Sequence, residues 1–321
     1  MGETIRLENL KDIVGFEIDL FICSSSFEER CFSVPNQIGE IGSRHSIVFF
    51  NSNEYAEIQK NAEKLVQVIG QANERSVELV PLNTDTQIQN AIKINDTLDA
   101  ALDNRLNSIV VDTTTFTHET LLIVIGLLNF KRAKFDKLSV TYVGAEDYST
   151  NEKNLSDKWL STGIEEVRTI MGYPGLMSPA RPNHLVILFG FESERTKKLI
   201  EHLEFDMISL GFGKKEASIG SNHYDLNSER HKQLMEVYSN ATEFELCLTD
   251  PFKAKEDILN HLKGFTNSNN VIVPMNNKLS TIGAALVAFE NPKVQLIYAK
   301  AVKYNVDGYS TPRNDVYVYQ L

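Results

Sequence analysis

A lysine stands just ahead of two hydroxyl residues in a polar run that follows an apolar stretch near residue 274. A point charge, hydroxyl groups and the exposed N–H groups at a helix start together suit an anion such as a phosphate. The run is not a Walker A loop, which needs glycines at fixed spacing before the lysine. We therefore predict an anion-binding site here; the alternative is a solvated lysine beside a capped helix. The predicted ligand-binding residues are Asn276, Asn277, Lys278, Ser280 and Thr281.

A second polar run begins with a carboxylate and is closely followed by His118. Carboxylates and imidazoles are common proton-transfer groups in enzymes. A place in the first turn of a helix would lower the pKa of His118 and favour its neutral form. The run predicts either a polar pocket floor with Asp112 and His118 as acid–base groups, or helix capping with a surface histidine. The residues assigned to a ligand here are Asp112, Thr113, Thr114 and Thr115.

Two shorter runs follow other apolar stretches. Ser24, Ser25 and Ser26 provide hydroxyls that suit a phosphate or a ribose, and N-capping of the next helix explains them equally well. Glu192 and Arg195 follow a single glycine, Gly190, which is not a dinucleotide fingerprint. We assign all five charged or hydroxyl residues to the same predicted ligand site.

The elements that position these residues alternate between strands and helices. In the first half we predict strands at 20–23, 47–50, 77–82, 109–111 and 138–143, and helices at 28–38, 54–71, 86–106 and 117–130. In the second half we predict strands at 185–189, 207–210, 244–248, 270–273 and 294–298, and helices at 192–203, 228–239, 251–262 and 280–289. Consecutive apolar positions within a strand indicate a mainly parallel sheet that is covered on both faces. Residues 316–319 predict one more strand, at an edge of a sheet.

The landmarks of the first half recur in the second half at an offset of about 160 residues, close to one ordinary α/β domain. We therefore predict an α/β protein of two tandem Rossmann-like domains, related by internal duplication. The predicted bounds are 1–146 for the first domain, 147–182 for a connector arm packed across both halves, and 183–321 for the second domain. Since ligands bind at the carboxyl ends of parallel strands, we expect all four polar runs to line one crevice.

Composition limits the classes of function. The chain has 321 residues and a formal net charge of −11, which argues against direct binding of a nucleic-acid backbone. Three cysteines without CxxC spacing fit reduced thiols, and no metal-binding motif or cofactor motif is visible. The acidic first twenty residues do not fit a signal peptide, and the longest apolar stretch is short of the roughly 20 residues that span a bilayer. We expect a soluble, cytoplasmic protein without a metal or cofactor.

The hydroxyl run after the first strand and the Lys278-Leu279-Ser280-Thr281 run after the fourth strand of the second half resemble the CARF-type domains of prokaryotic antiviral systems. The resemblance implies a Rossmann-like domain that binds a signalling nucleotide at a twofold cleft. Asn276 and Asn277 stand where that family often has small or glycine residues. In that family the twofold usually arises in a homodimer, whereas this chain would provide both halves itself.

Three functions follow from these patterns. The first is a sensor or binding protein for a small nucleotide-like or phosphorylated ligand, in an antiviral defence system and with a protein effector as partner. The second is a nucleotide-processing enzyme, a phosphodiesterase or glycosidase, with Asp112, His118, Glu192 or Asp250 as acid–base groups. The third is a structural subunit that binds a protein partner.

Overall fold

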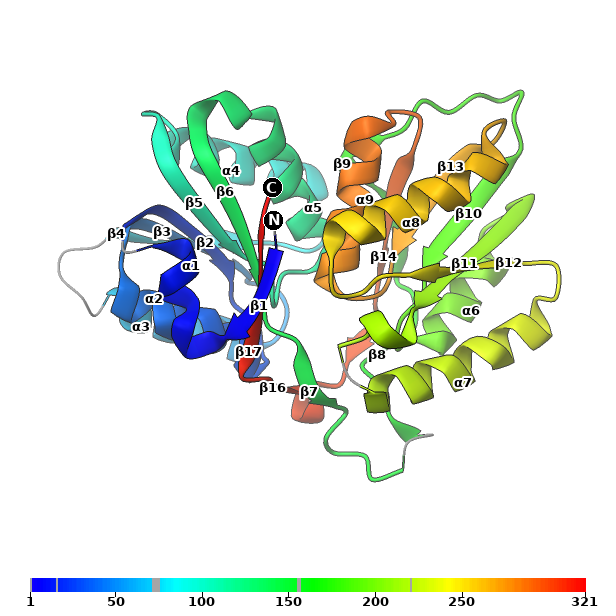
Figure 1. Ribbon diagram of the computed structural model, residues 1–321, viewed down its shortest axis with the longest axis horizontal. Coiled ribbons are helices and arrows are strands. Elements are labelled where there is room, and N and C mark those ends of the chain that lie inside the picture. The colour runs from blue at the N-terminus through cyan, green and yellow to red at the C-terminus, as the bar shows by residue number, and fades with distance from the viewer. Residues whose placement is uncertain (1, 16, 71–75, 155–156, 220) are drawn as a thin grey trace. The chain divides into compact units, whose positions relative to one another are not determined.

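The computed structural model describes residues 2–15, 17–70, 76–154, 157–219 and 221–321 (Figure 1). The chain forms two compact units. Unit 1 comprises residues 1–146 together with 310–321, and unit 2 comprises residues 147–309. The chain therefore passes from one unit to the other twice, after Glu146 and after Tyr309.

Unit 1 contains a seven-stranded sheet with the order β1-β17-β6-β5-β2-β3-β4. Strands β2 to β6 are parallel, and β1 and β17 are antiparallel to their neighbours. The strands are β1 (Gly2–Arg6), β2 (Ile18–Ser24), β3 (Ser43–Asn51), β4 (Ser76–Leu82), β5 (Leu106–Asp112), β6 (Phe135–Tyr142) and β17 (Asp315–Gln320). The helices are α1 (Leu10–Val14), α2 (Ser33–Ile41), α3 (Ala56–Gly70), α4 (Gln87–Ala101) and α5 (His118–Phe130).

Unit 2 contains a six-stranded sheet with the order β12-β11-β10-β13-β14-β9, in which only β9 is antiparallel among the described strands. The strands are β9 (Glu166–Pro174), β10 (Asn183–Leu188), β11 (Met207–Gly213), β12 (Thr242–Leu246), β13 (Asn269–Pro274) and β14 (Gln295–Lys300). The helices are α6 (Ser193–His202), α7 (Ser221–Val237), α8 (Pro251–Leu262) and α9 (Lys278–Glu290).

Both sheets place their first parallel strand in the middle, with the second and third strands on one side and the fourth and fifth on the other. This order is the Rossmann-like arrangement, and it puts a topological switch between β2 and β5 and between β10 and β13. The sequence pattern explains the burial, because every position of β2 is buried and α3 buries Ile58, Ala62, Leu65 and Ile69 along one face. The predicted fold class, two Rossmann-like α/β domains with mainly parallel sheets, is confirmed.

Most predicted elements lie within a few residues of the observed ones. Among the exceptions, residues 29–32 of the first predicted helix form a 3-10 turn and α2 begins at Ser33, and α4 ends at Ala101, five residues before the predicted end. Helix α7 begins at Ser221, seven residues before the predicted start. The strand expected at an edge was wrongly placed, because β17 lies between β1 and β6 (Figure 1). Its residues Val316, Tyr317, Val318 and Tyr319 are all buried, which fits an internal strand better than an edge. Residue 71 of the predicted second helix lies outside the described residues.

The two units exchange arms of the chain. After the first Rossmann-like repeat, β8 (Ser161–Thr162) and β9 belong to unit 2, where β9 pairs with β14. After the second repeat, β16 (Ser310–Pro312) and β17 return to unit 1, where β17 pairs with β6. We call residues 161–174 the connector arm and residues 310–321 the C-terminal arm. Residues 147–182, expected as a separate connector, are thus part of unit 2, and residues 310–321 are part of unit 1.

The two arms are attached at equivalent positions of the two repeats. Tyr142 and Ala145 near the end of the first repeat correspond to Tyr298 and Ala301 near the end of the second. In unit 1 the N–H of Arg313 donates to the carbonyl of Gly144 at 3.1 Å, and in unit 2 the N–H of Glu165 donates to the carbonyl of Lys300 at 2.9 Å. Each arm therefore joins its host sheet through the same kind of backbone contact.

Candidate functional site

The hydroxyl run after β2 is buried and bonded inward. The Ser25 hydroxyl donates to the carbonyl of Ile58 at 2.7 Å, and the Asn61 amide donates to the carbonyl of Ser26 at 2.9 Å. The Ser26 hydroxyl accepts a hydrogen bond from the N–H of Glu28, and the Ser24 hydroxyl donates to a neighbouring carbonyl. These bonds satisfy polar groups that would be costly to bury alone, so the run holds the loop against α3.

The polar run after β5 is also bonded inward. Asp112 is 2% exposed and accepts hydrogen bonds from Thr114, through both its N–H and its hydroxyl, and from the Thr141 hydroxyl. The Thr113 hydroxyl donates to the carbonyl of Thr141 at 2.8 Å. Burial raises the pKa of Asp112 to about 6, although the hydrogen bonds from Thr114 favour the charged form. The perturbed carboxyl fits an acid–base group by its pKa, but its depth in the sheet argues against contact with a substrate.

The helix that follows is capped by its own threonine. Thr117 is the N-cap of α5, and its hydroxyl accepts a hydrogen bond from the N–H of Thr120 at 3.2 Å. His118 is the first residue of α5 and is half-buried. Among the described residues, the carboxylate of Asp112 accepts its side-chain hydrogen bonds from Thr114 and Thr141. The hydrogen bonds that hold Asp112 thus come from threonines of its own loop and of β6, not from the predicted partner.

The equivalent loops of unit 2 are packed tightly together. A Cβ atom on Gly190 would lie 2.6 Å from the carbonyl oxygen of Met275, so only glycine allows the loops after β10 and β13 to approach this closely. The Asn276 amide bridges the same loops by donating to the carbonyl of Phe189. Asn277 is the N-cap of α9, and the hydroxyls of Ser280 and Thr281 donate back to its carbonyl. These four side chains organise the loop and the start of the helix.

Glu192 and Arg195 form a buried ion pair, and both side chains hydrogen-bond to the hydroxyl of Ser161 in the connector arm. The Arg195 guanidinium donates to Glu192, to the Ser161 hydroxyl at 2.9 Å and to the carbonyl of Ala299. The Ser161 hydroxyl in turn donates to Glu192. We call these three residues the connector latch, because they tie the arm to the loop after β10. Burial raises the pKa of Glu192, while the nearby charges of Arg195 and Lys278 act in the opposite direction.

Unit 1 has a matching set of residues. Arg30 donates to Glu28 at 2.8 Å, to the Ser310 hydroxyl at 2.9 Å and to the carbonyl of Val143 at 3.2 Å. The Ser310 hydroxyl donates to Glu28 at 2.6 Å. We call Glu28, Arg30 and Ser310 the C-terminal latch. The sequence carried a signal for both latches, since Phe-Glu followed by arginine two or three residues later occurs after the first strand of each repeat.

Within each unit, the structure brings the predicted runs together in pairs. In unit 1 the Thr115 hydroxyl donates to the carbonyl of Ser24 at 2.7 Å, which joins the loops after β2 and β5. In unit 2 Asn276 and Lys278 lie beside the loop that carries Glu192. Most of these side chains bind neighbouring protein groups, so the strand ends act mainly as loop supports.

A groove of about 630 Å³ in unit 1 was not predicted. It lies among the segment after β2, the helices α2 and α3, and the C-terminal arm. Its polar and charged lining residues are Glu29, Ser33, Asn36, Gln37, Glu57, Lys60, Asn61, Lys64, Arg313 and Asn314, and its apolar ones are Leu7, Phe27, Phe32 and Pro312. The volume is in the range of small-molecule sites.

Two lysines of the groove are not paired with a carboxylate in the part of the chain that the structure describes. Lys60 and Lys64 are exposed on α3, one turn apart, and neither makes an ion pair with any described residue. Like charges at this spacing destabilise a helix slightly. Arg313, in contrast, is paired with Asp315 at 2.8 Å and with Glu146 at 3.6 Å. The sequence pattern did not predict this site, because exposed lysines on an amphipathic helix are typical of its solvent-facing side.

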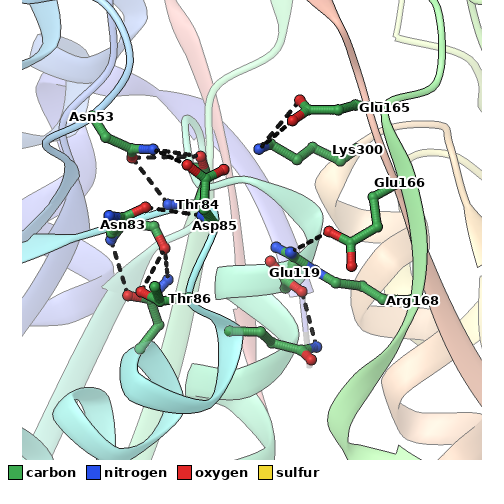
Figure 2. Close-up of polar contacts among 12 residues, drawn as sticks. Asn53, Asn83, Thr84, Asp85, Thr86, Glu119, Glu165, Glu166, Arg168 and Lys300 are labelled. Carbon is green, nitrogen blue, oxygen red and sulfur yellow. Dashed lines mark hydrogen bonds and ion pairs between the residues drawn. The ribbon is translucent and has the colours of Figure 1, made fainter.

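Two other polar regions of unit 1 are internally paired. A cavity of about 390 Å³ at the amino ends of the strands contains Asp19, whose carboxylate binds Arg44 at 3.2 Å and two backbone N–H groups. At the other end, Figure 2 shows Asn53 bonded to Thr84 and Asp85, which links the loops after β3 and β4. In both regions the polar groups form hydrogen bonds or ion pairs with other groups of the protein.

Figure 2 also shows two ion pairs near the connector arm of unit 2. Lys300 lies 3.2 Å from Glu165, and Arg168 lies 2.7 Å from Glu166. Both pairs place a mostly buried cation beside an exposed carboxylate. The Lys300 pair joins β14 to the connector arm and adds to its attachment, whereas Arg168 and Glu166 both lie within the arm. Among the described residues, no group of three or more His, Cys, Asp or Glu side chains is arranged to hold a metal ion.

No helix in the described ranges is both long and apolar enough to cross a membrane. No family model matches the chain, and no curated protein matches it. Among solved structures, the chain is similar to the cytoplasmic domain of a prokaryotic cation chloride cotransporter, at 8% identity and a TM-score of 0.28, over 91% of this chain and 99% of that one. It is also similar to an adenylation, ketoreductase and pseudo Asub multidomain structure of a keto acid-selecting NRPS module, at 9% identity and a TM-score of 0.26, over 89% of this chain and 20% of that one. Likeness at this level carries no argument about function.

Proposed function

We propose that this protein binds a small nucleotide-like or phosphorylated ligand in the groove of unit 1. The observation that carries the proposal is that Lys60 and Lys64, on the wall of a groove of ligand size, have no ion-pair partner among the described residues. A phosphate between them would relieve their mutual repulsion and accept charge-assisted hydrogen bonds. The negative net charge of the chain does not prevent this, because the contact is local.

The rest of the lining favours a nucleotide over phosphate alone. Phe27 and Phe32 offer aromatic surface on which a base can stack. Glu29 and Glu57 offer acceptors for ribose hydroxyls or an exocyclic amine, and Asn36 adds an amide. This mixture of cations, carboxylates and rings suits a ligand that has an anionic end and a hydrogen-bond-donating end.

Binding is favoured over catalysis by the state of the predicted acid–base groups. Asp112 is buried and accepts hydrogen bonds from threonines, and Glu192 forms an ion pair with Arg195 and accepts a hydrogen bond from Ser161. Neither lines the groove. The role in an antiviral defence system and the protein effector stay predictions from the resemblance to CARF-type domains.

Calorimetric titration with adenosine 5′-monophosphate and with inorganic phosphate tests the proposal. Replacing both Lys60 and Lys64 with alanine should weaken binding of both probes at least tenfold, since a charge-assisted hydrogen bond contributes about 1.5–3 kcal/mol. The control is Lys232→Ala, which removes an exposed lysine from α7 of unit 2 and should change nothing.

A second variant separates a nucleotide from a phosphate. Phe27→Leu keeps an apolar side chain but removes the ring, so it should weaken binding of the nucleotide and leave phosphate binding unchanged. If neither probe binds the unmodified protein, or if the double lysine variant binds both normally, the groove is not the site.

A further inference from the structure

The groove of unit 1 is completed by a segment that belongs to the second repeat. Pro312, Arg313 and Asn314 form one wall, and all three lie in the C-terminal arm. The arm is also attached to the segment that follows β1, because the carbonyl of Asn314 accepts a hydrogen bond from the N–H of Leu7 at 2.9 Å. When the arm is not docked, the groove loses a wall.

The segment after β2 contacts the groove and the arm with alternate residues. Phe27 and Glu29 line the groove. Glu28 and Arg30, which alternate with them, are 8% and 5% exposed at their side chains and bind Ser310 of the arm. A change in one set of contacts therefore shifts the same short stretch of backbone that carries the other set.

We propose that ligand binding in the groove and docking of the C-terminal arm stabilise each other. The proposal rests on the proposed function of the groove. Its physical basis is linkage: a ligand that contacts the groove only when the arm wall is present must favour the docked arm, and the docked arm must favour the ligand by the same factor. The chemical class of the ligand stays that of a phosphate-bearing small molecule.

The connector latch supplies a matched control within the same chain. Ser161 holds the connector arm in unit 2 as Ser310 holds the C-terminal arm in unit 1, and each hydroxyl binds one glutamate and one arginine. Neither serine lines the groove. Ser310→Ala and Ser161→Ala therefore remove the same group from two arms, only one of which forms the groove.

The test combines amide hydrogen exchange with titration of adenosine 5′-monophosphate. In the unmodified protein the nucleotide should slow exchange in residues 313–320. Ser310→Ala should speed exchange there at least fivefold, because the variant loses the buried hydrogen bonds that the hydroxyl makes with Glu28 and Arg30, and it should weaken nucleotide binding by a similar factor. Ser161→Ala should speed exchange in residues 166–174 and leave nucleotide binding unchanged. Ser310→Thr, which keeps a hydroxyl, should restore both properties in the C-terminal arm.

Each outcome decides the proposal. If Ser310→Ala speeds hydrogen exchange in the C-terminal arm but leaves nucleotide affinity unchanged, Ser310 holds the arm without any effect of the arm on ligand binding, and the proposal is overturned. Equal loss of affinity in Ser161→Ala and Ser310→Ala would show a general loss of stability and overturn it as well. If the unmodified protein binds no nucleotide, the proposed function fails and the coupling with it, whereas the exchange data still show whether Ser310 holds the arm.

Discussion

The two units share a strand order but differ in what lies beside the fifth strand. In unit 2 the connector arm places β9 directly on β14, and β9 ends the sheet. In unit 1 the C-terminal arm places β17 on β6, and β1 then pairs with β17 on its other side. The position of the arm is therefore a common property of the repeats, and the strand beyond it is specific to unit 1.

The two arms have the same relation to the repeats, because each follows one repeat and joins the unit of the other. The connector arm pairs with β14 through β9, and the C-terminal arm pairs with β6 through β17. A pair of repeats satisfies both arms at once, as in an exchanged dimer whose two chains have been fused. The two latches are the side-chain counterpart of this exchange, with the same three residue types in each unit.

The largest change in stability is expected when the arginine of each latch is replaced. Arg30→Met leaves Glu28 buried with only Ser310 as a hydrogen-bonding side chain, and should lower the free energy of unfolding of unit 1 by about 3–5 kcal/mol. Arg195→Met should cost less, because Lys278 lies close enough to Glu192 to offset part of the lost charge. Urea unfolding followed by hydrogen exchange in each unit measures the difference.

A double variant checks the cause. Combining Arg30→Met with Glu28→Gln removes the uncompensated carboxylate and should recover most of the lost stability. If the single and double variants were equally unstable, the cost would come from packing, and the latch would have no electrostatic role.

The second effect is an opposite response of the two units to acid. In unit 2 the Nε2 atoms of His184 and His261 lie 2.7 and 2.8 Å from the Ser209 hydroxyl, in a network that also contains Thr242 and Asn270. Burial lowers the pKa of His261 to about 4, so its charged form is disfavoured in the folded state. Stability of unit 2 should be full above pH 6.5 and should fall by on the order of 2–3 kcal/mol as the pH drops to about 4.

In unit 1 the stability is expected to change with pH in the opposite direction. The raised pKa of Asp112, about 6, means that its neutral form is favoured in the folded state. Its contribution to stability is present below the unfolded pKa near 3.8 and is lost as the pH rises to about 6, by on the order of 2–3 kcal/mol. Fluorescence of Trp159, the single tryptophan of the chain, reports unit 2, and exchange of β2 and β5 amides reports unit 1. His261→Phe and Asp112→Asn should flatten the respective profiles, and parallel profiles in both units would contradict the assignment.

A smaller effect compares the caps of the two helices that follow the fourth strands. Thr117 caps α5 in unit 1, and Asn277 caps α9 in unit 2. Thr117→Ala should cost about 1 kcal/mol. Asn277→Ala should cost about 2 kcal/mol, because its amide also donates to the carbonyl of Leu248 at 2.7 Å and so links two loops. Thermal unfolding measures both, and an equal cost would mean that the Leu248 contact contributes nothing.

The sequence predicted the fold because its signals are local. The apolar run of β2 and the spacing of Ile58, Ala62 and Leu65 identify a buried strand and an amphipathic helix without knowledge of their neighbours. The exchange of the arms was not predictable in the same way, because the host of β17 depends on pairing with β6, about 175 residues earlier. The edge position assigned to that strand failed for this reason.

The site was harder to predict than the fold, because residue type does not show where a side chain points. Ser25 and Thr113 have the hydroxyls expected of a phosphate site, yet they donate to the backbone carbonyls of Ile58 and Thr141. The groove, in contrast, is lined by Lys60 and Lys64 on one helix and by Arg313 far away in the chain. Only the docked C-terminal arm brings these groups to one surface.

The smallest expected effect concerns Lys278, which has no counterpart in the equivalent loop of unit 1. Lys278→Ala should lower the free energy of unfolding by less than about 1 kcal/mol, since the buried carboxylate of Glu192 keeps Arg195 as its main partner. It should leave adenosine 5′-monophosphate binding unchanged, because Lys278 does not line the groove of unit 1. Calorimetric titration of this variant beside the Lys60 and Lys64 double variant separates the two candidate anion sites. A loss of binding in Lys278→Ala with normal binding in the double variant would move the ligand to the strand ends of unit 2, where the sequence first placed it.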